Sequence, residues 1–169
     1  MSKLFINERA FFYNKSYPIT DEAGNEKYLI DEDTGMADFI AYVRDLEGET
    51  KVTIKREKIA FGPKYLVTLD NGNRFTITRA QGLLKQDLIA ESDDDTLSFS
   101  GDLWKFNFQT LNKDREIVAA VRLDSHKGTD AYTLDIYDEN YEKEMLGILI
   151  VVKNIIGLQR TSSMIIAST

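Results

Sequence analysis

The stretch Met145-Leu146-Gly147-Ile148-Leu149-Ile150-Val151-Val152 is the most apolar part of the sequence, and its conformation decides the fold. Asp138 or Asn140 can cap a helix that begins before it, and the glutamates at 139, 142 and 144 suit the first turns of that helix. A helix that is apolar on all sides must be buried all round. A buried strand is the alternative, because periodicity alone does not separate the two. The acidic start and the length favour a core helix over about residues 139–156, with Gly157 at its C-terminal end.

The chain that precedes this stretch alternates apolar and polar residues, a pattern typical of half-buried antiparallel strands. Trp104, Phe106 and Phe108 are separated by polar residues, and Asn71-Gly72 suits a hairpin with a type I′ turn. About twelve such strands follow at intervals of about 8–14 residues, which indicates a sandwich or a barrel. We therefore predict a mainly β protein, a closed antiparallel β-barrel of about twelve strands that encloses a hydrophobic C-terminal α-helix.

The length fits one domain, which we place at residues 1–160, followed by a tail at 161–169. Residues 5–69 can be aligned with residues 75–136, with similar strands and turns in the same order. This alignment predicts two half-repeats that form the two halves of one closed structure. The small polar and apolar residues of the tail fit either a docked terminal strand or a frayed end.

Composition excludes several classes of protein. The 169 residues include 21 Lys and Arg against 28 Asp and Glu, a net charge of −7, which argues against nucleic-acid binding. The absence of Cys, and the single histidine, His126, exclude disulfides, thiolate metal sites and paired-histidine zinc sites. No stretch has the roughly 20 apolar residues of a membrane-spanning helix, and the N-terminus lacks the apolar region of a secretory signal. We expect a cytoplasmic protein without a transmembrane segment, and a peripheral place at a membrane stays open.

Motifs of familiar catalytic chemistry are missing from the sequence. It contains no glycine-rich phosphate loop, no dinucleotide fingerprint and no serine nucleophile elbow. Asp33-Thr34-Gly35 matches the aspartic-protease triplet, but no second copy is present to share the proton. We therefore expect no catalytic residue, no metal site, no cofactor and no enzymatic activity.

A locally basic stretch stands out in this acidic chain. On a strand, alternate residues of the stretch would share one outward face, where they could bind anionic headgroups at roughly 1 kcal/mol per cation. The ordinary alternative is the solvated exterior of a barrel. The candidate anion-binding or lipid-binding residues are Lys51, Lys55, Arg56, Lys58 and Lys64.

Several loose motifs resemble the LURP-one-related family. They are Tyr17-Pro18-Ile19-Thr20-Asp21-Glu22-Ala23-Gly24, Asp45-Leu46-Glu47-Gly48, Gly101-Asp102-Leu103-Trp104-Lys105-Phe106 and Thr129-Asp130-Ala131-Tyr132-Thr133-Leu134-Asp135-Ile136. The resemblance covers about residues 3–156. Ala131 stands where a Thr is usual in that family, and Lys153 where an Asp is common. The resemblance implies a tubby C-terminal-like fold, a twelve-stranded barrel around a hydrophobic helix, in a superfamily that also holds phosphoinositide-binding tubby proteins and phospholipid scramblases.

Two functional hypotheses follow. The first is a non-catalytic binding or scaffold protein that binds anionic phospholipid headgroups at the membrane periphery through the basic stretch. The second is a cytoplasmic protein-interaction or regulatory module without lipid binding, which would use acidic turns such as Asp31–Asp33 and Asp93–Asp95. Neither hypothesis sets the oligomeric state.

Overall fold

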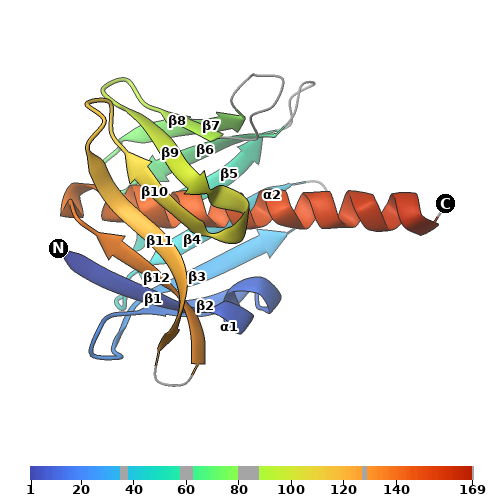
Figure 1. Ribbon diagram of the computed structural model, residues 1–169, viewed down its shortest axis with the longest axis horizontal. Coiled ribbons are helices and arrows are strands. Elements are labelled where there is room, and N and C mark those ends of the chain that lie inside the picture. Colours follow the sequence, from blue (N-terminus) through green and yellow to red (C-terminus); the bar gives the residue numbers. More distant parts are fainter. Residues whose placement is uncertain (35–37, 58–62, 80–87, 127–128, 169) are drawn as a thin grey trace.

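The chain forms a closed antiparallel barrel of twelve strands with one long helix along its axis (Figure 1). This computed structural model describes residues 1–34, 38–57, 63–79, 88–126 and 129–168. Each strand pairs with its neighbours in sequence, and β1 (Ser2–Asn7) pairs with β12 (Thr129–Ile136) to close the barrel. The predicted fold class is confirmed.

The remaining elements follow in chain order. A short helix, α1 (Glu8–Tyr13), connects β1 to β2, and its N-cap Asn7 accepts a hydrogen bond of 2.9 Å from the amide of Ala10. Two 3-10 turns, η1 and η2, lie at Leu103–Lys105 and Glu139–Tyr141. The strands are β2 (Ser16–Thr20), β3 (Glu26–Thr34), β4 (Phe39–Arg44), β5 (Thr50–Glu57), β6 (Lys64–Leu69), β7 (Arg74–Arg79), β8 (Leu88–Glu91), β9 (Thr96–Asp102), β10 (Asn107–Leu111) and β11 (Ile117–His126).

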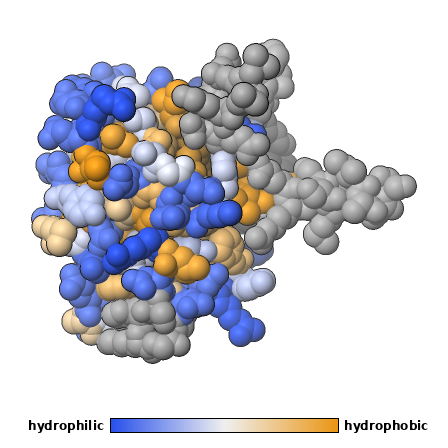
Figure 2. Space-filling view, viewed as in Figure 1, coloured by the Kyte–Doolittle hydropathy of each residue, from blue (hydrophilic) through white to orange (hydrophobic). Residues whose placement is uncertain are grey.

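Alternation along the strands separates the core from the surface. In β5, Val52 and Ile54 are fully buried and point inward, whereas Lys55 is exposed. Figure 2 shows the outcome on one face, where hydrophilic side chains dominate and apolar ones are scattered among them. Each fully buried aliphatic side chain contributes about 1.5–3 kcal/mol to stability, so the two-residue period specifies which face turns inward.

The long helix α2 (Glu142–Ser168) fills the barrel and packs most extensively against β5 and β6. Its side chains from Met145 to Val152 are at most 1% exposed, apart from the glycine at 147. A Cβ on Gly147 would lie 2.9 Å from Cγ1 of Val67, so only a glycine allows the helix to approach β6 this closely. The sequence therefore predicted the buried helix correctly, and the alternative of a buried strand is wrong.

The C-terminal end of this helix differs from the prediction. The expected helix ended at residue 156, with Gly157 as its stop signal, but α2 continues through Gly157 to Ser168. The predicted tail, a docked strand or a frayed end at 161–169, is therefore wrong up to Ser168. No proline follows Gly157, and good helix formers such as Leu158 and Gln159 come next, so the hydrogen-bonded helix has no reason to stop.

The hairpin between β6 and β7 confirms one prediction and corrects another. Strands β6 and β7 are joined by a tight turn, as predicted from Asn71-Gly72. A type I′ turn requires positive φ at both residues, whereas Gly72 has φ 89° and Asn71 does not have a positive φ. The amide of Leu69 donates a hydrogen bond of 2.8 Å to the carbonyl of Asn73, so the loop is longer than two residues.

Six strands fall in each of the two proposed half-repeats, and their origin by duplication stays a prediction.

The barrel has two different ends, which we call the turn end and the exit end. At the turn end lie the N-terminus, the start of α2 and the hairpin turns that follow β2, β4, β6, β8 and β10 (Figure 1). At the exit end lie α1 and η1, and there α2 leaves the barrel and projects beyond it (Figure 1). Among the described residues, no helix has the length and hydropathy needed to cross a membrane.

Candidate functional site

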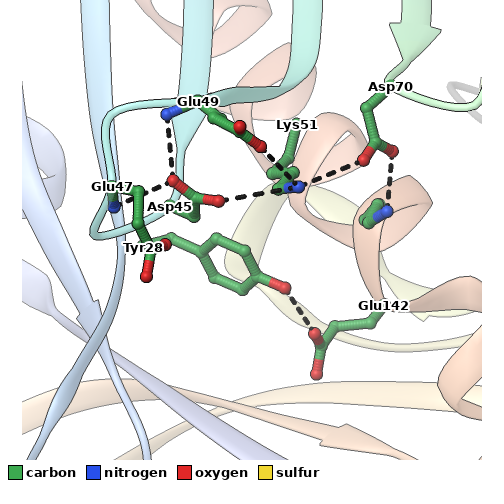
Figure 3. A network of polar contacts seen from close by, with 8 residues as sticks. Tyr28, Asp45, Glu47, Glu49, Lys51, Asp70 and Glu142 are labelled. Atoms are coloured by element: carbon green, nitrogen blue, oxygen red, sulfur yellow. Dashed lines mark hydrogen bonds and ion pairs between the residues drawn. The ribbon is translucent and has the colours of Figure 1, made fainter.

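Lys51 lies at the turn end, where three carboxylates surround its ammonium group (Figure 3). Its ammonium group is 3.5 Å from Asp45, 3.4 Å from Glu49 and 3.4 Å from Asp70. Asp70 also pairs with Lys143 of α2 at 2.6 Å, and the bond from Lys143 is the main cause that lowers the pKa of Asp70. The hydrogen bond from Lys51 to Asp70 raises the pKa of Lys51. Lys51 therefore joins two hairpin turns to the start of α2, and its charge is compensated within the protein.

Glu142 anchors the first turn of α2 to the opposite wall of the barrel. Its carboxylate accepts hydrogen bonds from Tyr28 Oη at 2.7 Å, Lys27 Nζ at 3.0 Å and Ser2 Oγ at 3.1 Å. Burial alone would raise the pKa of Glu142, but the bonds from Tyr28 and Lys27 outweigh it and hold that pKa below its usual value. These contacts hold the helix within the barrel rather than form a binding site.

A buried ion pair holds α2 near the exit end. Lys153 pairs with Glu32 of β3, and the side chains are 12% and 5% exposed. The ammonium group lies 4.6 Å from the ring centroid of Tyr17 and 5.2 Å from that of Phe11, which adds cation–π attraction. Burial lowers the pKa of Lys153 and raises that of Glu32, and their mutual attraction opposes both shifts.

The five cations of the predicted basic stretch lie in different surroundings. Lys51 is enclosed by carboxylates, and Lys64 is 3.9 Å from Glu57. The Arg56 guanidinium donates a bond of 2.9 Å to Asn154 of α2, which also accepts a bond from Tyr65. Lys55 is exposed and has no ion pair in the described part of the chain. Lys58 lies outside the described residues. Among the described members of this stretch, Lys55 is thus the one whose charge is available for a ligand.

Four further cations lie at the exit end with Lys55. They are distant from Lys55 along the chain, so the sequence did not indicate that they belong together. They come from α1, from the loop before β2, from the end of β7 and from η1, and the barrel alone brings these elements to one end. All are exposed, and none pairs with a carboxylate among the described residues. The four cations are Arg9, Lys15, Arg79 and Lys105.

Aromatic side chains accompany these cations. The Arg79 guanidinium lies 5.5 Å from the ring centroid of Trp104, next to Lys105, and Tyr13 of α1 is 80% exposed. Exposed carboxylates at this end include Asp33, Asp38 and Asp130. The exit end therefore carries a mixture of charges, with several cations that are free to meet a ligand.

The turn end is acidic by contrast. Thirteen of the 28 acidic residues lie in the connections 21–25, 45–49, 70–73, 92–95, 112–116 and 137–141, where Lys113 and Arg115 are the two cations. Asp93–Asp95 form part of an acidic turn, as the sequence indicated. Asp31 and Asp33, by contrast, lie within β3 rather than in a turn, and Asp31 pairs with Arg44 of β4.

A groove of about 950 Å³ opens among β6, β7, β8, β9 and the start of α2. Its lining includes apolar side chains such as Leu66 and Phe75, the acidic turn Asp93–Asp95, and Tyr141 and Glu144. One carboxylate oxygen of Glu144 is buried and has no hydrogen-bond partner. The sequence predicts that this glutamate lies in the first turns of a helix, and it predicts no role for it in a groove.

These features define a class of protein: a closed antiparallel barrel whose interior is occupied by its own C-terminal helix, which leaves its ends and its exterior as the accessible surfaces. The chain belongs to the LURP-one-related family, whose family model matches residues 2–153. Family and barrel together suggest a non-catalytic, tubby-like protein.

A solved structure supports the fold. The chain is similar to an Arabidopsis thaliana protein determined by X-ray crystallography, with a TM-score of 0.62 and 14% sequence identity. The similarity covers 91% of this chain and 90% of that one. A comparison with curated protein sequences finds no match. At this identity the likeness shows the shared fold and carries no function.

Proposed function

We propose that this protein is a non-catalytic, cytoplasmic binding protein that attaches to anionic membrane surfaces through the exit end of its barrel. The observation that carries the proposal is the set of five exposed cations at that end, Arg9, Lys15, Lys55, Arg79 and Lys105, which have no carboxylate partner among the described residues. Each cation near an anionic surface contributes about 1 kcal/mol.

The acidic turn end supports the same orientation. An anionic membrane repels the turn end, with its thirteen carboxylates, so the exit end faces the lipid. Trp104 and Tyr13 at the exit end suit the headgroup region, because aromatic rings with polar edges favour that interface. Of the cations predicted from the sequence, this proposal keeps Lys55 as a headgroup contact, whereas Lys51, Arg56 and Lys64 already have partners within the barrel.

Co-sedimentation with vesicles tests the proposal. The protein should pellet with vesicles of phosphatidylcholine and phosphatidylserine, should stay in solution with pure phosphatidylcholine, and should release as NaCl rises, because salt screens the attraction. The triple variant Lys55→Glu, Arg79→Glu and Lys105→Glu should bind about tenfold less tightly or worse.

A matched control makes the same charge change at the other end. Arg74→Glu, Lys113→Glu and Arg115→Glu reverse three exposed cations of the turn end. This control variant should bind vesicles like the unmodified protein. Equal loss of binding in both variants would show that net charge, rather than the exit end, governs attachment, and the absence of pelleting with any anionic vesicle would refute the proposal.

A further inference from the structure

The helix α2 continues beyond the barrel at the exit end (Figure 1). Ile155 is 3% exposed, whereas Leu158, less than one turn later, is 37% exposed. Residues 158–168, which we call the projecting segment, therefore form about three turns of helix outside the barrel. At about 1.5 Å of rise per residue, the projecting segment extends about 16 Å from the exit end.

The projecting segment has an unusual sequence for a helix in water. Residues 145–169 include no Asp or Glu, although the chain holds 28 of them, and Arg160 is the one cation of the segment. The consecutive residues Met164, Ile165 and Ile166 occupy different faces of a helix, so this turn is apolar on all sides. A short helix is marginal in water unless it packs against another surface, so the segment needs a partner.

The position of the projecting segment favours a lipid surface as that partner. Because α2 runs along the barrel axis, the segment leaves the barrel at the end that carries the five exposed cations of the exit end (Figure 1). An anionic membrane attracted by these cations would meet the segment end on. Trp104 and the exposed Tyr13 lie at the same end, where aromatic rings suit the headgroup region.

We infer that the projecting segment inserts into one leaflet of an anionic membrane, with Met164, Ile165 and Ile166 among the acyl chains. This inference rests on the proposed attachment of the exit end and names the part of the chain that enters the lipid. A length of about 16 Å matches about half of a hydrocarbon core that is roughly 30 Å thick. Arg160 lies closer to the barrel, where a long cationic side chain can keep its charge among the phosphates.

Tryptophan fluorescence tests the depth of insertion. The variant Trp104→Phe with Ile165→Trp has one tryptophan, which lies in the projecting segment. With vesicles of phosphatidylcholine and phosphatidylserine, its emission should shift to shorter wavelength. Lipids with a spin label in the middle of an acyl chain should quench it more strongly than lipids labelled at the headgroup, because the introduced ring would lie below the phosphates.

The same experiment separates this inference from the proposed function. If the variant pellets with anionic vesicles and acyl-chain labels leave its fluorescence unchanged, insertion is refuted and attachment through the cations stands. If it pellets with no anionic vesicle, the proposed attachment is refuted, and insertion with it.

A triple serine variant tests how much the apolar turn contributes to binding. Met164→Ser, Ile165→Ser and Ile166→Ser remove apolar surface without changing the net charge. This variant should bind vesicles of phosphatidylcholine and phosphatidylserine about tenfold less tightly or worse, because the lost apolar surface no longer leaves water.

The matched control removes three exposed apolar side chains from the turn end, by Leu46→Ser, Ile117→Ser and Tyr137→Ser. The control should bind these vesicles like the unmodified protein, and equal affinity of the two serine variants would contradict the inference. A second copy of the chain is the alternative partner of the segment. A dimer of the unmodified protein in size-exclusion chromatography without lipid, together with a monomer of the variant altered at 164–166, would overturn the inference.

Discussion

At the scale of single residues, the ion pair between Lys153 and Glu32 holds α2 in the barrel, but its formation requires the desolvation of two charged side chains. Replacement of Lys153 by Met should lower the free energy of unfolding by about 3 kcal/mol, because Glu32 would be left charged, buried and without its cation. Urea denaturation monitored by circular dichroism measures the loss.

The matched variant removes both charges. Lys153→Met combined with Glu32→Leu should recover most of the lost stability, since an apolar pair of similar volume avoids the desolvation of two ions. A double variant as unstable as the single one would mean that packing around Lys153, rather than charge, sets the effect.

Glu144 offers a second prediction at this scale, and it concerns pH. Burial raises the pKa of Glu144 in the folded protein, so the ionised carboxylate opposes folding. As pH rises from below the usual glutamate pKa through the raised folded value, this residue lowers the stability of the protein. Glu144→Gln should therefore raise the free energy of unfolding at neutral pH by about 1 kcal/mol, and the gain should vanish near pH 4. Thermal unfolding over this pH range checks the result, and a gain that does not depend on pH would contradict it.

At the scale of the element, two glycines of α2 have opposite roles. Gly147→Ala should destabilise the protein by about 1–3 kcal/mol, because the new methyl group would lie 2.9 Å from Val67 Cγ1 inside a packed core. Gly157→Ala should stabilise it by about 0.5–1 kcal/mol, since nothing lies within 4 Å of the new methyl group and alanine is the better helix former. Chemical denaturation of the two variants compares them directly, and Val67→Ala should partly rescue the first. The same sign for both substitutions would contradict the assignment of one glycine to the core and the other to solvent.

The elements also show what the sequence could and could not predict. The apolar run from Met145 and the two-residue period of the strands are local patterns, so the core helix and the barrel were predictable. The end of α2 was not, because a glycine stops a helix only where the next residues favour another conformation. The basic stretch was predicted from proximity along the chain, yet Arg56 points inward to Asn154 and Lys51 meets Asp70 across the strands. Arg9 and Lys105 share an end through strand topology, which no local pattern records.

At the scale of the whole molecule, the contrast between the two ends predicts how the barrel lies on a membrane. Trp104 is the single tryptophan of the chain, and it lies at the exit end beside Arg79. Its fluorescence should shift to shorter wavelength on addition of vesicles that contain phosphatidylserine, and spin-labelled headgroups should quench it, because the ring would enter the less polar interface.

The control places the probe at the other end of the same barrel. In a Trp104→Phe background, Leu46→Trp puts the fluorophore on the hairpin turn after β4, where Leu46 is 65% exposed. This variant should still bind vesicles, but its tryptophan fluorescence should neither shift nor be quenched, because the lipid repels the thirteen carboxylates of the turn end. Quenching of both probes would mean that the barrel lies on its side, and quenching of the Leu46→Trp probe alone would mean that it binds in the reverse orientation. Either result would mean that the cations of the exit end do not determine how the protein is oriented on the membrane.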